Sequence, residues 1–159
     1  MGKRGNIWLG VSGLVTNEKG EWLVVKKKYG GLKGQWSFPA GFVDEAETLH
    51  EAVLREIREE TGVEASIDGI IGVRSGVLLE KISDNMIIFK LSAKSSEITV
   101  QEDELEDVQF LSPAKLGQDP SSSLLLVHFA KQGVYKELHL IDDADPGKQF
   151  GYSSYTLFL

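Results

Sequence analysis

Apolar and polar residues along the chain gather in short runs that are typical of β-strands. Such runs occupy residues 7–15, 22–27, 67–73, 86–91 and 108–111. The first two flank residues 17–20, a polar segment that ends in glycine and predicts a tight connection between antiparallel strands. We therefore expect a sheet-rich domain that opens with a β-hairpin.

Two segments break this pattern and predict helices. The first covers residues 49–61 and stops at Gly62, and Thr48 and Glu51 before it form a T-x-x-E capping box that fixes where it begins. The second covers residues 122–131, after Pro120. Because strands dominate and the helices are set among them, the fold class we expect is α+β.

The length of 159 residues fits a single domain, which we place at residues 1–159. Residues 133–159 form a C-terminal extension in which 135–141 and 152–158 have extended patterns around an aspartate-rich turn. Two arrangements stay open for this extension. It either adds edge strands to the same domain or pairs with a second chain in a homodimer.

Composition narrows the classes of function. The chain has 17 Lys and Arg against 24 Asp and Glu, a net charge of −7, which argues against a general nucleic-acid binder or a binder of anionic membranes. The absence of cysteine excludes disulfide frameworks, zinc-thiolate sites and cysteine nucleophiles. No apolar run approaches the roughly 18 residues of a membrane span, so we expect a cytoplasmic protein.

The first predicted helix carries an unusual set of carboxylates. At 100° per residue, Glu56, Glu59 and Glu60 continue its apolar stripe and face the protein, whereas Glu51 and Arg58 point to solvent. Like charges this close repel one another, and more strongly near a low-dielectric interior, so they need compensation. Carboxylate oxygens are ligands that Mg²⁺ or Mn²⁺ prefers, and a salt-bridged helix face is the alternative explanation.

Arg55 borders these carboxylates, and its guanidinium can hold one of them through two parallel hydrogen bonds. From Gly41 to Val63 the chain reads GFVDEAETLHEAVLREIREETGV. This segment resembles the Nudix box, G-x5-E-x7-R-E-U-x-E-E-x-G-U with U apolar, at every specified position. Residues 34–41 also resemble the family's approach to the box, with Ala40 where Pro-Gly-Gly is commoner.

The resemblance implies an α/β/α sandwich with a mixed sheet and the box helix on one side. It also implies hydrolysis of a nucleoside diphosphate linked to another moiety, with Mg²⁺ or Mn²⁺ as cofactor. Glu56, Glu59 and Glu60 would be metal ligands, with Glu56 possible as a base as well. The remaining roles that it implies are a backbone carbonyl near the metal from Gly41, support of the loop or of an outer-shell water by Glu47, and positioning of the carboxylates by Arg55.

Nudix members commonly take a further carboxylate from a loop beyond the box. The acidic run 101–107 offers four candidates, Glu102, Asp103, Glu104 and Glu106. We favour Glu104 as a ligand or general base, and a solvated acidic loop is the alternative.

Aromatic and basic residues before the box suggest substrate contacts. Tyr29, in a glycine-rich loop, is a candidate to stack on a base or form a lid, and Lys28 is a candidate to contact phosphates. An incidental loop aromatic and a solvated strand end are the ordinary explanations. Trp36 and Phe110 are expected in the core.

Three functional hypotheses follow. The leading one is a Mg²⁺-dependent hydrolase of a small nucleotide derivative, and the second is a non-catalytic nucleotide-binding or regulatory module, which the intact glutamates disfavour. The third, an mRNA-cap hydrolase, needs a basic RNA path that the charge does not suggest. The downstream proline of ADP-ribose-type members and the downstream tyrosine of the dinucleoside-polyphosphate type are both absent before Pro113. The substrate therefore stays open among nucleoside triphosphates, nucleotide sugars and other diphosphates.

Overall fold

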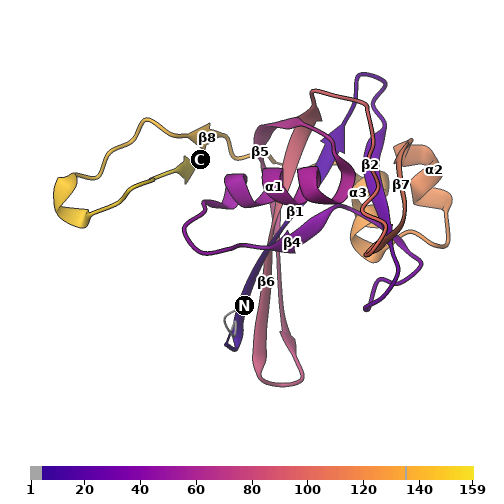
Figure 1. Cartoon of the computed structure of the whole chain (residues 1–159), viewed down its shortest axis with the longest axis horizontal. Coiled ribbons are helices and arrows are strands. Elements are labelled where there is room, and N and C mark those ends of the chain that lie inside the picture. The colour runs from indigo at the N-terminus through magenta and orange to yellow at the C-terminus, as the bar shows by residue number, and fades with distance from the viewer. Residues whose placement is uncertain (1–4, 135) are drawn as a thin grey trace.

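A computed structural model describes residues 5–134 and 136–159 (Figure 1). The strands are β1 (Ile7–Thr16), β2 (Trp22–Lys27), β3 (Trp36–Ser37), β4 (Ala40–Phe42), β5 (Ala65–Leu78), β6 (Ile82–Ala93), β7 (Leu105–Leu111), β8 (Leu140–Ile141) and β9 (Leu157–Phe158). The helices are α1 (Leu49–Thr61), α2 (Pro113–Gln118), α3 (Leu124–Gln132) and the 3₁₀ turn η1 (Lys148–Phe150). Within the described ranges, no helix combines the length and the apolar character that crossing a bilayer requires.

Seven of the strands form one mixed sheet. Its order is β3-β2-β1-β6-β5, with β4 paired to β1 and β7 paired to β2. The β1–β6 pair is parallel and the other pairs are antiparallel. The predicted opening hairpin is confirmed at its turn, where Thr16 pairs with Trp22, and beyond the turn β1 also pairs with β4 and β6.

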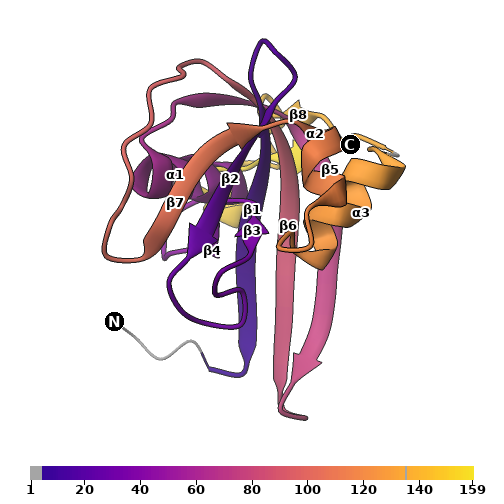
Figure 2. The ribbon, with the colours of Figure 1, turned by 90° about the vertical axis from the view of Figure 1, so that its right-hand side faces the viewer.

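The sheet separates two apolar cores. On one face, Val11 of β1 packs with Val53 and Ile57 of α1. On the other face, Leu14 of β1 packs in a cluster that includes Phe129 of α3 and residues of α2 (Figure 2). Successive β1 side chains point to opposite faces, so one strand serves both cores. This arrangement confirms the expected α+β class and the layered sandwich.

Several elements differ from the sequence expectations. The strands predicted at 67–73 and 86–91 are the central parts of β5 and β6, which continue into a hairpin that projects from the body (Figure 1). Residues 73–80 are exposed there, so they lack the half-buried alternation by which strands are recognised. The short strands β3 and β4 and the helix α2 were not predicted, because two to six residues carry too little periodicity. The second predicted helix begins at Leu124 rather than at 122, since Ser123 caps it.

The C-terminal extension packs on the same domain. Leu138 and Ile70 of β5 exchange two backbone hydrogen bonds of 2.9 Å, and the ring of Phe158 meets that of Phe89 edge to face at 5.5 Å. The extended pieces predicted at 135–141 and 152–158 are each reduced to a strand of two residues, β8 and β9, which pair with each other. Residue 135 itself lies outside the described residues. Pairing of the extension with a second chain stays a prediction.

Candidate active site

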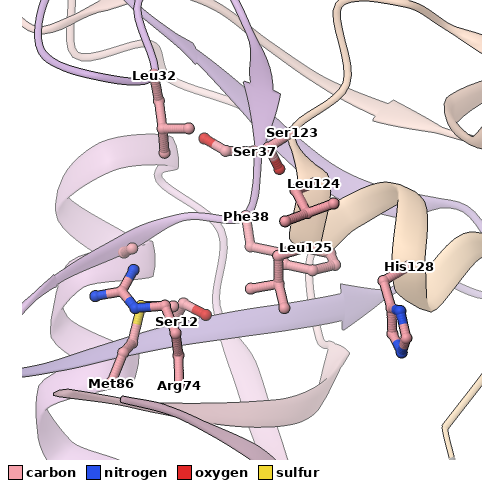
Figure 3. Close-up of a pocket in the computed structure, with 11 residues that line it drawn as sticks. Ser12, Leu32, Ser37, Phe38, Arg74, Met86, Ser123, Leu124, Leu125 and His128 are labelled. Atoms are coloured by element: carbon pink, nitrogen blue, oxygen red, sulfur yellow. The ribbon is translucent and has the colours of Figure 1, made fainter. Parts of the chain in front are cut away.

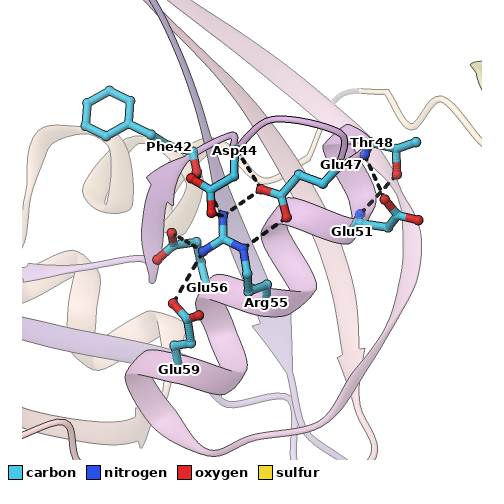
Figure 4. A network of polar contacts seen from close by, with 8 residues as sticks. All are labelled: Phe42, Asp44, Glu47, Thr48, Glu51, Arg55, Glu56 and Glu59. Atoms are coloured by element: carbon cyan, nitrogen blue, oxygen red, sulfur yellow. Dashed lines mark hydrogen bonds and ion pairs between the residues drawn. The ribbon is translucent and has the colours of Figure 1, made fainter. Parts of the chain in front are cut away.

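The ends of α1 are fixed by local sequence. Thr48 Oγ1 accepts a hydrogen bond from the Glu51 N–H, and the Glu51 carboxylate accepts one from the Thr48 N–H at 2.8 Å (Figure 4). The helix ends at Gly62, whose φ of 74° suits a residue without Cβ. Both ends confirm the capping box and the glycine stop, and they set the register of every glutamate on this helix.

One guanidinium holds together the carboxylates at the start of the box (Figure 4). Arg55 Nε and Nη2 donate to the two Glu47 oxygens at 3.0 and 2.6 Å, and Nη1 donates to Glu56 at 2.8 Å and to Glu59 at 3.3 Å. Nη2 also donates to the carbonyl of Phe42 at 3.0 Å. The two-pronged pair expected of Arg55 is therefore present and is made with Glu47.

These contacts and the burial of the site shift the pKa values of Glu47, Arg55 and Glu56. Hydrogen bonding to Arg55 lowers the pKa of Glu47, and the same bond raises the pKa of Arg55. Burial raises the pKa of Glu56, although its hydrogen bond to Arg55 opposes that shift. Glu47 also accepts a hydrogen bond from the Asp44 N–H at 2.7 Å. It thereby ties the loop before α1 to the helix, in agreement with the loop-supporting role that the resemblance implies.

Glu60 is the most deeply buried carboxylate of the box, with a side chain only 3% exposed. Its contacts are long: the Ala40 N–H donates at 3.3 Å, and Lys27 Nζ lies 3.9 Å from Oε1. Burial raises the pKa of Glu60 to about 7, and the charge of Glu56 adds to the shift. A negative charge here is weakly compensated by the protein itself.

At Gly41 the Glu56 carboxyl group comes close to the backbone of β4. Gly41 lies opposite Val11 in the β4–β1 pair, directly below α1, and a Cβ built on it would overlap the Glu56 carboxyl group. The absence of a side chain lets the carboxylate rest against the strand backbone. A larger residue here would push the Glu56 carboxyl group away from its present position.

The face assignments on α1 are confirmed with one exception. Glu51 and Arg58 are exposed, and Arg58 pairs with Glu64 at 2.8 Å. The side chains of Glu56 and Glu60 are turned inward. The expectation that Glu59 faces the body is wrong, because its side chain is 55% exposed. Glu59 lies at the flank of the apolar stripe, and its side chain turns outward to pair with Arg55.

The acidic loop beyond the box lies near these groups. The negative charge of Glu104 contributes to the raised pKa of Glu60. The Glu104 carbonyl accepts a hydrogen bond from the Lys28 N–H at 3.0 Å. The ammonium of Lys28 and the hydroxyl of Tyr29 donate to the carbonyls of residues 102 and 103. Both candidate substrate contacts therefore tie the glycine-rich loop to the acidic loop.

Two side chains expected in the core are there, and one site residue was missed. Trp36 is buried and Phe110 is partly buried against the α1-side core, which confirms both expectations. Lys27 was not singled out from the sequence, yet its ammonium lies 3.9 Å from the Glu60 carboxylate. Strand alternation in β2 was the available signal, since it places Lys27 on the face of the buried Val25.

The fit of this set to a divalent cation rests on its chemistry. Among the described residues, no group of three or more His, Asp or Glu side chains is arranged closely enough to hold a metal ion. Arg55 draws Glu56 and Glu59 to itself instead. Buried Glu60 beside Glu56, next to an open glycine backbone, is nevertheless a hard-oxygen donor set with unbalanced negative charge, as Mg²⁺ requires.

Comparison with known proteins identifies the family. The model of the NUDIX domain matches residues 7–132. The chain belongs to the Nudix family. Nudix hydrolase 2 of Arabidopsis thaliana is 38% identical over 107 residues, which make up 65% of this Nudix chain and 38% of that protein. The NAD-capped RNA hydrolase NudC of Pseudomonas aeruginosa is 32% identical over 120 residues, which make up 76% of this chain and 42% of that protein.

This Nudix chain thus spans about two fifths of the length of these curated relatives. The fold agrees with a solved structure of a MutT NUDIX hydrolase from Burkholderia pseudomallei, with a TM-score of 0.67 at 23% identity. That match covers 79% of this chain and 97% of the solved chain.

Proposed function

We propose that this Nudix domain hydrolyses a phosphoanhydride bond in a nucleoside diphosphate linked to another moiety, with Mg²⁺ as cofactor. The observation that carries the proposal is Glu60, a buried and weakly paired carboxylate that lies with Glu56 on the inward side of α1. The complete box supports it, and so does a relative that is named as a hydrolase of NAD-capped RNA.

The metal would be held by Glu56, Glu59 and Glu60 with the Gly41 carbonyl. When bound, such an ion neutralises phosphate charge and makes a water molecule more acidic. Arg55 positions the carboxylates, and Glu47 keeps the box loop on the helix. Glu104 is the proposed base, which would take the proton of the attacking water.

Two groups before the box would contact the substrate. Lys28 and Tyr29 lie at the start of the glycine-rich loop and are exposed. Released from the carbonyls of residues 102 and 103, the Lys28 ammonium would pair with a phosphate and the Tyr29 ring would cover a base. The same release would free the acidic loop that carries Glu104.

A second candidate function, nucleotide binding without hydrolysis, is favoured by one observation. Arg55 engages both Glu56 and Glu59, so two of the three proposed ligands are paired within the protein. A module in which this pairing persisted would bind a nucleotide and leave it intact. Metal dependence separates the two functions.

The test is product release from a substrate panel by the wild type, Glu60→Gln and Glu64→Gln. The panel contains nucleoside triphosphates, ADP-ribose, nucleotide sugars, dinucleoside polyphosphates and coenzyme A, each with Mg²⁺ and then Mn²⁺. We expect Glu60→Gln to lower turnover by about 1,000-fold or more because a metal ligand is lost, with unchanged circular dichroism. Glu64→Gln is the matched control, because Glu64 is exposed and pairs with Arg58 away from the site.

Turnover by Glu60→Gln at the wild-type rate would contradict the assignment of this glutamate. A folded wild type that cleaves nothing in the panel, yet binds one of its members in calorimetry, would support the binding module instead.

A further inference from the structure

One edge of the main sheet is open along the projecting hairpin. β5 is the outermost strand, and at Ile70 its outer side exchanges hydrogen bonds with Leu138 of the C-terminal extension. Beyond that contact, no strand within the described residues pairs with the outer side of β5 (Figure 2). Regular pairing with β6 resumes at Gly72 and runs to Leu78, and we call residues 72–78 the open edge. Its outward backbone donors and acceptors are a template for another strand.

The open edge lacks the protection that edge strands usually have. Lysine, proline or a covering segment commonly blocks such an edge. The sequence of the open edge, GVRSGVL, contains neither lysine nor proline, and its one charged side chain, Arg74, is paired with Asp84 at 2.8 Å. Val73 and Val77 are 65% and 72% exposed, so apolar surface accompanies the free backbone groups. An edge of this kind is suited to pairing with a further strand.

The pattern of the open edge is complementary to itself. Its midpoint is Ser75, and residues 73, 75 and 77 share one face of the strand. An antiparallel copy related by a two-fold axis at Ser75 places each Val73 opposite the partner's Val77. The strand thus forms two apolar cross-strand pairs with a second copy of itself, one on each side of the axis.

The opposite face of the strand adds charge complementarity. The same register places the partner's Arg74 opposite Gly76, and Gly76 itself pairs with Asp84 of β6. A Cβ built on Gly76 would meet nothing within 4 Å, so the space over this glycine is open. Two strand spacings of about 4.8 Å each separate the partner's Arg74 from Asp84, a gap that an extended arginine spans. Each Asp84 can therefore receive a guanidinium from the other copy.

We infer that this chain forms a two-fold symmetric dimer in which the open edges of two copies pair antiparallel about Ser75. The two main sheets then continue into one, and the C-terminal extension stays on its own domain. Arg74 and Asp84 also line a hollow of about 210 Å³ that Lys27 and Gly41 border. The partner's Arg74 therefore joins the rim of a hollow beside the candidate active site.

Sedimentation equilibrium of the wild type, Val77→Lys and Leu79→Lys tests the pairing. Both changes replace an exposed apolar side chain by lysine, but Leu79 lies in the turn, outside the open edge. We expect the wild type to dimerise and Val77→Lys to raise the dimer Kd about tenfold or more, because both valine pairs are lost. Leu79→Lys should dimerise like the wild type. Circular dichroism checks that both variants are folded.

A cysteine on the axis reports the register directly. The chain has no cysteine, and in the dimer the two copies of residue 75 lie opposite each other. Ser75→Cys should therefore form an intermolecular disulfide under mild oxidation, because directly opposite residues bring their Cβ atoms to about 4.5–5.5 Å. Val77→Cys is the control, since residue 77 faces residue 73 and its two copies lie about 13 Å apart along the strands.

Arg74→Asp and Asp84→Arg test the ion pair between copies. Each variant alone carries like charges at both positions, so each should be monomeric. In a mixture, one copy supplies two aspartates and the other two arginines, and only contacts between copies join opposite charges. Native mass spectrometry of the mixture should therefore show a heterodimer.

A wild type that stays monomeric at its highest soluble concentration overturns the proposal. So does a dimer that Val77→Lys and Leu79→Lys weaken equally, because that result indicates non-specific apolar association. Cross-linking of Ser75→Cys no better than that of Val77→Cys, or a mixture of the charge variants without heterodimer, overturns the register.

Discussion

The two faces of the sheet differ in whether their buried polar groups are paired. On the α1 side, Arg55 already pairs with Glu47, Glu56 and Glu59 in the free protein. On the α3 side, the hydroxyls of Ser12 and Ser37 are left unpaired. Charged groups cost far more than hydroxyls when they are buried without partners. Even Glu60 keeps two long contacts, to the Ala40 N–H and to Lys27, whereas the two hydroxyls have none.

This difference separates two modes of binding. A cation on the α1 side must compete with Arg55 for its ligands, and the carboxylates must move to meet it. The apolar cavity on the α3 side has walls that are already in place. We therefore expect binding on the α1 side to depend on charge and pH.

After Glu60→Gln, the largest effect is expected from Glu104→Gln, which tests whether the acidic side extends beyond the box. Because Glu104 is the proposed general base, its replacement should lower kcat by about 100-fold, with KM little changed. Steady-state kinetics on the substrate found in the panel measure this.

Glu106→Gln is its control, because it makes the same charge change two residues away on an exposed position of β7. Equal losses in the two variants would show that the loop acts only through its total charge.

Arg55→Lys breaks the internal pairing without removing the positive charge. Lysine lacks the planar fork that holds Glu47 by two bonds and reaches Glu56 and Glu59 as well. We expect kcat to fall about tenfold and unfolding free energy to fall by about 1–2 kcal/mol, since the partly buried carboxylates lose donors. Urea unfolding of the metal-free protein measures the second effect. Unchanged stability in this variant would mean that the network contributes nothing to the fold.

The smallest effect concerns pH and sharpens the contrast between the faces. Burial raises the pKa of Glu60 in the folded, metal-free protein to about 7, from an ordinary value of 4.5. If only the ionised form binds Mg²⁺, apparent affinity should fall roughly fourfold from pH 8 to pH 6.5. A Mg²⁺ titration monitored by calorimetry at both pH values tests this.

The same pKa has a consequence for stability. A carboxyl whose folded pKa is raised favours the folded state fully below pH 4.5, and this contribution is lost as the pH rises through 7. Metal-free wild type should therefore lose up to roughly 3 kcal/mol between pH 4.5 and pH 8 from this group, whereas Glu60→Gln should not.

Much of the α1 side could be predicted from sequence because its signals are local. The capping box, the glycine stop and the helical spacing fix where Glu56 and Glu60 point, and both are turned inward. The exposure of Glu59 was not predicted, since a residue at the flank of a stripe can turn outward, and Glu59 does so toward Arg55 one turn earlier on the same helix.

The α3 side carried no such signal. Ser12 and Ser37 are ordinary serines in short apolar runs, and only the pairing of β4 with β1 and of β3 with β2 brings their strands together. The cavity of about 470 Å³ on this side is lined by residues from Ser12 to His128, so no local stretch of sequence contains it (Figure 3). The projecting part of β5 and β6 was missed for a related reason, because it buries little and shows no strand periodicity.

The parallel pairing of β1 with β6 has a consequence for how the protein is made. It joins each β1 residue to one 76 positions later, from Ile7 with Ser83 to Thr16 with Ser92. Contacts this distant in sequence form late and slow folding. During synthesis, β1 cannot pair with β6 until β6 has left the ribosome, and α1 and the whole Nudix box emerge earlier. The whole segment of the box helix is thus synthesised before the sheet against which the helix packs can form.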